Sequence, residues 1–111
     1  MVGRGLVWWR WLPLPWRKWR IILNVDQADK IPRWLPRAGA VVVGNDLADK
    51  WIAFNCPCNR GHRVMLNLSH SRPPAWTILT KEPLTLIPSV DDIGSGRRCH
   101  YFVTDGLTKW V

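Results

Sequence analysis

The strongest constraint on this chain is a Cys-Pro-Cys turn, Cys56-Pro57-Cys58, that lies between two strand-like stretches. Residues 51–55 precede the turn and are largely apolar, and residues 63–68 follow it with alternating character. Short runs of this kind, bounded by turn residues, predict a β-hairpin, here with two thiols at its tip. The remaining cysteine, Cys99, stands beside His100 at the start of a further strand-like run.

These thiols predict a structural metal site. Structural zinc is bound by four thiolate or imidazole ligands. Cys56 and Cys58 are two positions apart, so they face the same way on a regular strand. Cys99 and His100 are adjacent, so both can be ligands only if the chain bends there. We therefore predict one zinc ion bound by Cys56, Cys58, Cys99 and His100, with His62 as the alternative fourth ligand. The competing interpretation is three reduced, partly buried cysteines without a metal.

The size of the chain and its cysteine count indicate one domain with reduced thiols. Its 111 residues match the usual size of a single domain. Three cysteines are an odd number, which argues against a complete disulfide framework. No secretory signal is evident, and no run reaches the roughly 18 apolar residues that a transmembrane helix needs. We therefore expect a cytoplasmic protein with no transmembrane segment.

The first twenty residues differ from the rest of the chain. They hold five of the nine tryptophans and five positive charges without any acidic residue, in a chain whose net charge is +8. Pro13 and Pro15 disfavour a continuous helix there. We predict an N-terminal arm over residues 1–20 and a β domain with the Cys/His cluster over residues 21–111. The arm is suited to packing on the domain, to a protein partner, to nucleic acid or to peripheral membrane contact.

The pattern of residues 21–111 predicts a mainly β fold. Apolar runs of strand length recur between turn residues, and Asp105-Gly106 is a strong hairpin dipeptide. We expect a single small domain with an antiparallel sheet or open barrel of about seven short strands and little helix. The expected strands cover residues 21–25, 38–44, 51–55, 63–68, 76–80, 84–90, 100–104 and 107–111.

No familiar catalytic motif is present. The chain has no nucleophile elbow, P-loop, dinucleotide fingerprint or His-Glu-x-x-His sequence. The acidic residues lie mostly in predicted turns, where they commonly serve the turn itself. The sequence therefore predicts no catalytic residue, and a thiol-dependent or metal-dependent enzyme is the third-ranked interpretation.

Several segments carry a family resemblance. Besides residues 51–58 and 61–63, they are Ala40-Val41-Val42-Val43-Gly44, Leu66-Asn67-Leu68, Arg72-Pro73-Pro74-Ala75-Trp76, Leu86-Ile87-Pro88-Ser89-Val90, Arg97-Arg98-Cys99-His100-Tyr101-Phe102 and Trp110. Over residues 38–111 the chain resembles small bacterial proteins that share a domain of unknown function. This chain has Asn59 where relatives often have glycine, and Arg97 where some have cysteine.

The resemblance implies a functional context. Some relatives carry the label ammonia monooxygenase, which conflicts with the lack of a membrane span or a histidine cluster here. Others lie near ubiquitin-like conjugation genes, which implies an accessory role. We therefore expect a non-enzymatic, zinc-stabilised binding or adaptor module with a protein partner. The alternative is a nucleic-acid-binding protein that uses the basic arm together with Arg97 and Arg98.

Overall fold

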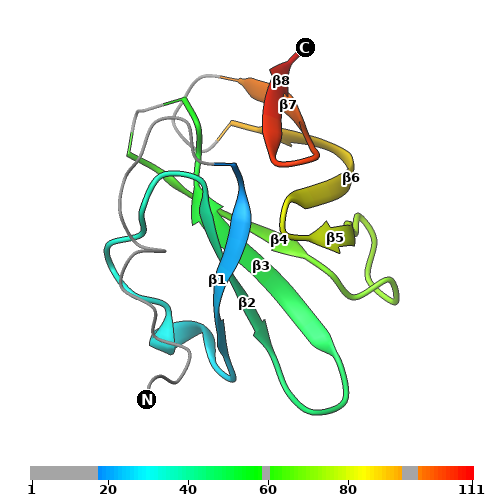
Figure 1. Ribbon diagram of the computed structural model, residues 1–111. Coiled ribbons are helices and arrows are strands. Elements are labelled where there is room, and N and C mark those ends of the chain that lie inside the picture. The colour runs from blue at the N-terminus through cyan, green and yellow to red at the C-terminus, as the bar shows by residue number, and fades with distance from the viewer. Residues whose placement is uncertain (1–17, 59–60, 94–97) are drawn as a thin grey trace.

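The chain folds into two four-stranded β-sheets (Figure 1). A computed structural model describes residues 18–58, 61–93 and 98–111. The strands are β1 (Arg20–Val25), β2 (Gly39–Gly44), β3 (Asp49–Asn55), β4 (Arg63–Asn67), β5 (Thr77–Lys81), β6 (Leu84–Asp92), β7 (Cys99–Thr104) and β8 (Leu107–Trp110). The one helical element among these residues is a 3-10 turn, η2 (Ala28–Lys30). The predicted mainly β fold with little helix is confirmed.

Both sheets keep the order of the sequence. The first sheet runs β1-β2-β3-β4 and the second runs β5-β6-β7-β8. β1 and β2 pair in parallel, and the other neighbours pair antiparallel. A parallel pair needs a crossover connection, which residues 26–38 provide. Leu35 in this connection packs with Ile22 and Val41, so the crossover covers an apolar cluster of the first sheet.

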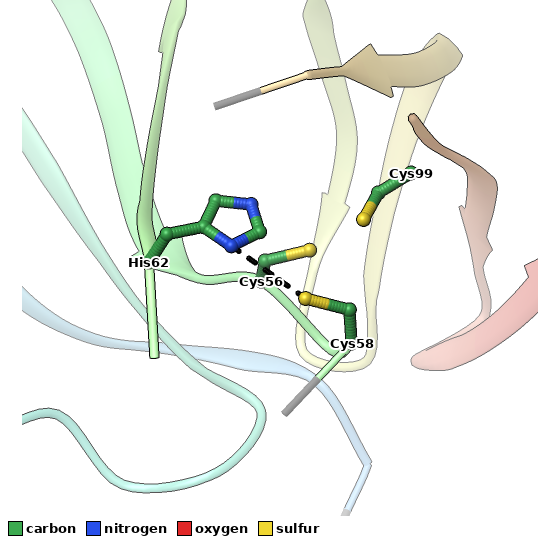
Figure 2. Close-up of side chains that lie close together, drawn as sticks. All are labelled: Cys56, Cys58, His62 and Cys99. Atoms are coloured by element: carbon green, nitrogen blue, oxygen red, sulfur yellow. Dashed lines mark hydrogen bonds between the residues drawn. The ribbon is translucent and has the colours of Figure 1, made fainter. Parts of the chain in front are cut away.

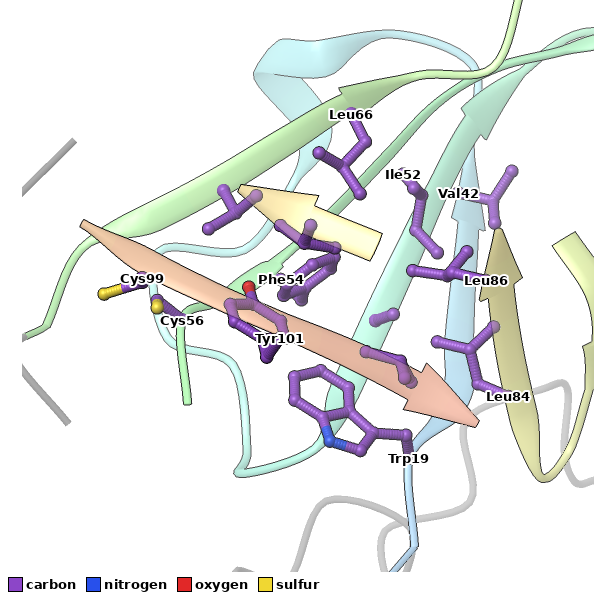
Figure 3. Packing of buried hydrophobic residues seen from close by; sticks show 14 residues of the cluster. Trp19, Val42, Ile52, Phe54, Cys56, Leu66, Leu84, Leu86, Cys99 and Tyr101 are labelled. Carbon is purple, nitrogen blue, oxygen red and sulfur yellow. The ribbon is translucent and has the colours of Figure 1, made fainter. Parts of the chain in front are cut away.

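One apolar core joins the two sheets. Alternation along each strand turns one face of each sheet inward, as the core residues Phe54 of β3 and Tyr101 of β7 illustrate (Figure 3). Trp19, just before β1, is 5 % exposed and packs edge-on against Phe54 with ring centroids 5.1 Å apart. Its indole nitrogen donates a hydrogen bond of 2.8 Å to Thr108 of β8. Trp19 therefore links the two sheets.

Most of the predicted arm lies outside the described residues. Residues 1–17 are among those not described, so the division of the chain into an arm over residues 1–20 and a β domain stays a prediction. Trp19 and Arg20 are described, and both are buried. In the part of the chain that the structure describes, no helix is long and apolar enough to cross a membrane.

Candidate metal centre and Ser–His pair

Three thiols and one imidazole converge where the β3–β4 turn meets the start of β7 (Figure 2). Cys56, Cys58 and His62 belong to that turn, and Cys99 is the first residue of β7. Their ligand atoms all lie within 4.8 Å of one another, and the three cysteines are not joined by disulfides. Three sulfurs and one imidazole nitrogen are a known ligand set of structural zinc. The cluster could therefore hold a metal ion.

The histidine in this cluster is His62. Its Nδ1 lies 3.5 Å from the sulfur of Cys58. By contrast, the Nε2 of His100 lies 2.9 Å from the hydroxyl oxygen of Ser89. Along the start of β7 buried and less buried residues alternate, so Cys99 faces the core and its neighbour His100 does not. Of the four predicted ligands, the structure brings together the three cysteines but not His100. It places His62, the alternative fourth ligand, beside them.

A carboxylate fixes the orientation of His62. The Nε2 of His62 lies 2.7 Å from a carboxylate oxygen of Asp92, the last residue of β6. Both side chains are largely shielded, with exposed fractions of 14 % and 26 %. Histidines that bind metals usually donate their second N–H to a carboxylate, which sets the tautomer. Asp92 thus leaves Nδ1 of His62 as the nitrogen that faces the thiols.

The surroundings of Cys56 favour its neutral thiol unless a cation is bound beside it. Burial raises the pKa of the Cys56 thiol to about 12, and the Cys58 and Cys99 side chains add to this rise. Burial also raises the pKa of Tyr101, and the negative charge that Cys56 can carry raises it further. The Tyr101 hydroxyl is buried without a hydrogen-bond partner among the described residues. A metal-bound thiolate at Cys56 would give this hydroxyl an acceptor, so the donor set fits a metal.

A second constellation lies on β6 and β7. Ser89 and His100 are each partly exposed, and their hydroxyl and imidazole groups are 2.9 Å apart. This is the separation of a hydroxyl nucleophile hydrogen-bonded to its general base. The indole of Trp76 donates a 3.2 Å hydrogen bond to the carbonyl oxygen of Ser89, which holds the backbone beside the hydroxyl.

An irregularity in β6 brings Ser89 within hydrogen-bond distance of His100. The β6–β7 ladder pairs Leu86 with Val103 and next pairs Val90 with Tyr101, so β6 has two more residues than β7 in this interval. Bulges of this kind bend a strand, redirect side chains and often lie next to active sites. Ser89 lies within the bulge. Proline is tolerated at such positions because the ladder is already interrupted, which explains Pro88 inside β6.

Asp91 supplies a negative charge near His100. These two residues are partners in the β6–β7 ladder. Arg98 donates two hydrogen bonds, of 2.8 and 2.7 Å, to the Asp91 carboxylate. The Arg98 guanidinium lowers the pKa of Asp91, and charge on His100 lowers it further. Asp91 is therefore an anion that lies across the ladder from His100.

Other hydroxyl groups in the described residues have different partners. Ser69 and Ser71 share a hydrogen bond of 2.8 Å with each other. His70 lies 2.9 Å from the hydroxyl of Thr77, in an exposed pair. Among the described serines, Ser89 is the one that the structure pairs with a histidine.

Sequence reasoning missed Ser89, Asp91 and Asp92. Ser89 and His100 are eleven positions apart, and no short motif joins them. The available signal was indirect, because Leu86–Val90 and Arg97–Phe102 are two of the segments that carry the family resemblance. Asp91 and Asp92 lie beyond the strand expected over residues 84–90, whereas in the structure they end β6 and face His100 and His62 respectively.

Comparison with known proteins identifies one family. The family model described as "Bacterial ubiquitination-like system serine protease (BubE)" matches residues 26–111. No curated protein and no solved structure matches the chain. The matched range contains the cysteine cluster, Ser89 and His100.

Proposed function

Because the chain belongs to the BubE family of bacterial ubiquitination-like systems, we propose that it is a serine peptidase with Ser89 as nucleophile and His100 as general base. The observation that carries this assignment is the 2.9 Å separation between the Ser89 hydroxyl and His100 Nε2. The family description names serine protease chemistry, and Ser89 is the described serine with a histidine partner.

The geometry supports acyl transfer in two steps. His100 Nε2 takes the hydroxyl proton while Ser89 Oγ attacks the carbonyl carbon of the substrate, and His100 then gives that proton to the leaving amine. Water, activated by His100 in the same way, releases the acyl group from Ser89. Asp91 stabilises the imidazolium that forms in each step, as a nearby anion does in serine hydrolases.

The surroundings of the pair favour a protein substrate. Ile87 and Phe102 flank Ser89 and His100 in sequence, with exposed fractions of 46 % and 45 %. A cleft of about 560 Å³ lies elsewhere, beside Cys56 and Trp110, and neither Ser89 nor His100 lines it. The family acts in a ubiquitination-like system, so its partners include proteins. We assign the substrate to the proteins of that system.

Zinc has a structural role in this proposal. Cys56, Cys58, His62 and Cys99 would hold it, and bound zinc supplies folding free energy and leaves no open position for chemistry. The sequence-based ligand set with His100 as fourth ligand is replaced here by the set with His62. His100 is thereby free to act as the base.

Labelling with a fluorophosphonate probe tests the assignment. The probe phosphorylates activated serine hydroxyls, so the wild-type protein should be labelled on Ser89. The variants S89A and H100A should lose labelling, and S71A should keep it because the Ser71 hydroxyl is hydrogen-bonded to Ser69. Equal labelling of wild type and S89A, or no labelling of the zinc-loaded wild type, would overturn the assignment.

A zinc-stabilised adaptor without catalytic activity is the second candidate. Exposed Trp34 and Trp110 favour it, since large apolar side chains on a surface commonly mark protein contacts. An adaptor would bind its partner protein equally well as wild type and as S89A, and neither would hydrolyse an activated ester. The nucleic-acid alternative has less support, because Arg98 is already paired with Asp91.

A further inference from the structure

We infer that the metal centre clamps the ends of β6 and β7, so that metal loading controls the reactivity of Ser89. The inference rests on the peptidase function proposed above. Asp92 is its key positioning residue, since it connects the metal-facing His62 to the strand that carries Ser89.

The clamp is needed because the catalytic end of the β6–β7 ladder is short. Beyond the bulge, three residue pairs hold the two strands together: Val90 with Tyr101, Asp91 with His100, and Asp92 with Cys99. A ladder end of three pairs next to a bulge frays easily, because terminal backbone hydrogen bonds open at low free energy. Ser89 and His100 are on opposite strands of this segment, so fraying separates them.

The last pair of the ladder is the one that the metal centre holds. Asp92 and Cys99 face each other there. Cys99 contributes its sulfur to the cluster, and Asp92 contacts His62 at 2.7 Å. Both strands are thus tied to the β3–β4 turn, which belongs to the other sheet. One bound metal ion would fix β6, β7 and that turn together.

Apart from the metal centre, β8 holds β7 on its far side, through the Tyr101–Trp110 pair and the Val111 N–H bonded to the His100 carbonyl. Among the described residues, by contrast, the outer end of β6 has no strand beyond it. Arg98 and Asp91 form an ion pair whose side chains are 64 % and 44 % exposed. Exposed pairs of this kind contribute little to stability. A metal bond to Nδ1 of His62 would hold the imidazole in place, and Asp92 would then anchor the end of β6 to a fixed partner. Without the metal, the distance between Ser89 and His100 would depend on the three ladder pairs that join the end of β6 to β7.

Hydrogen exchange and probe labelling, measured on the full chain, test the clamp together. The zinc-loaded protein and the same protein after chelation are compared by mass spectrometry. We expect amides in residues 89–92 and 98–101 to lose more protection on chelation than amides in β1, β2 and β3. Fluorophosphonate labelling of Ser89 should slow at least about tenfold in the same sample and recover when zinc is returned.

Variants at Asp92 separate positioning from simple loss of fold. D92A should weaken zinc binding by about 10- to 100-fold and slow labelling, since second-shell partners of metal ligands have effects of this size. D92N should recover part of both, because its amide oxygen still accepts the His62 hydrogen bond. D49A is the matched control: Asp49 is an exposed carboxylate at the start of β3, and its removal should change neither value.

The outcomes test the metal clamp and the peptidase assignment separately. Unchanged labelling after complete zinc removal would overturn the clamp and leave the peptidase assignment intact. An equal loss of protection in both sheets would also overturn it, because the metal would then act on the whole fold and not on this end of β6 and β7. Failure of the zinc-loaded protein to react with the probe would overturn the peptidase assignment, and the exchange pattern alone would then decide the clamp.

Discussion

Cys99 and His100 are consecutive residues of β7 that contribute to two different sites. Cys99 is buried in the cysteine cluster, and His100 hydrogen-bonds Ser89 on the other side of the strand. Adjacent residues of a strand face opposite sides of the sheet, so one short segment can support a metal centre and a catalytic pair at once. A shift of one residue in the register of β7 would turn Cys99 away from the cysteine cluster and His100 away from Ser89, which would abolish both sites.

The variants H62A and H100A should therefore affect different sites. H62A removes a ligand and should lose zinc, whereas H100A should keep one zinc per chain. H100A should lower the labelling rate of Ser89 by about 10²- to 10⁴-fold, the usual contribution of a general base. Elemental analysis and probe labelling of the two purified variants measure both effects. Loss of zinc in H100A, with zinc retained in H62A, would restore His100 as the fourth ligand.

Zinc affinity should rise with pH. Burial raises the pKa of the Cys56 thiol to about 12, so in metal-free protein at neutral pH this thiol holds its proton. Zinc binds the thiolate, so binding must release that proton, and the apparent affinity should rise about tenfold per pH unit for each proton released. Calorimetric titrations in two buffers of different ionisation enthalpy count the protons. Release of none would show that Cys56 is not a ligand.

The fold could be predicted from the sequence because its signals are local. The runs around Cys56-Pro57-Cys58 and Asp105-Gly106 fix two antiparallel hairpins by alternation and turn chemistry. The parallel pairing of β1 with β2 has no such local signal. It depends on the crossover through residues 26–38 and on Leu35 packing against Ile22 and Val41.

The candidate sites were harder to predict, for two physical reasons. The choice between His62 and His100 depends on whether β7 is regular at Cys99, which neighbouring Gly94 and Gly96 left open. The pairing of Ser89 with His100 depends on the bulge in β6, because two extra residues there set which side chains meet across the ladder. Bulges change register without a sequence signal of their own.

Trp19 should be a large contributor to stability. It is 5 % exposed, packs against Phe54 and hydrogen-bonds Thr108 of the other sheet. W19A should lower the free energy of unfolding by about 3–5 kcal/mol, as truncation of a large core aromatic does. W34A is the control, since Trp34 is 57 % exposed and should change the value by less than about 0.5 kcal/mol. Denaturant titration measures both, and equal effects would contradict the core role of Trp19.

Asp91 should tune His100 through charge and should not be essential. Its carboxylate is 44 % exposed and accepts both of its described hydrogen bonds from Arg98. An exposed charge interaction contributes little, so D91N should slow labelling of Ser89 by about fivefold at most. Zinc content should not change, because Asp91 does not contact the cysteine cluster. R98A frees the carboxylate from its ion pair and should not slow labelling. A loss of 10³-fold or more in D91N would instead make Asp91 the residue that orients His100, in the role of the third member of a catalytic triad.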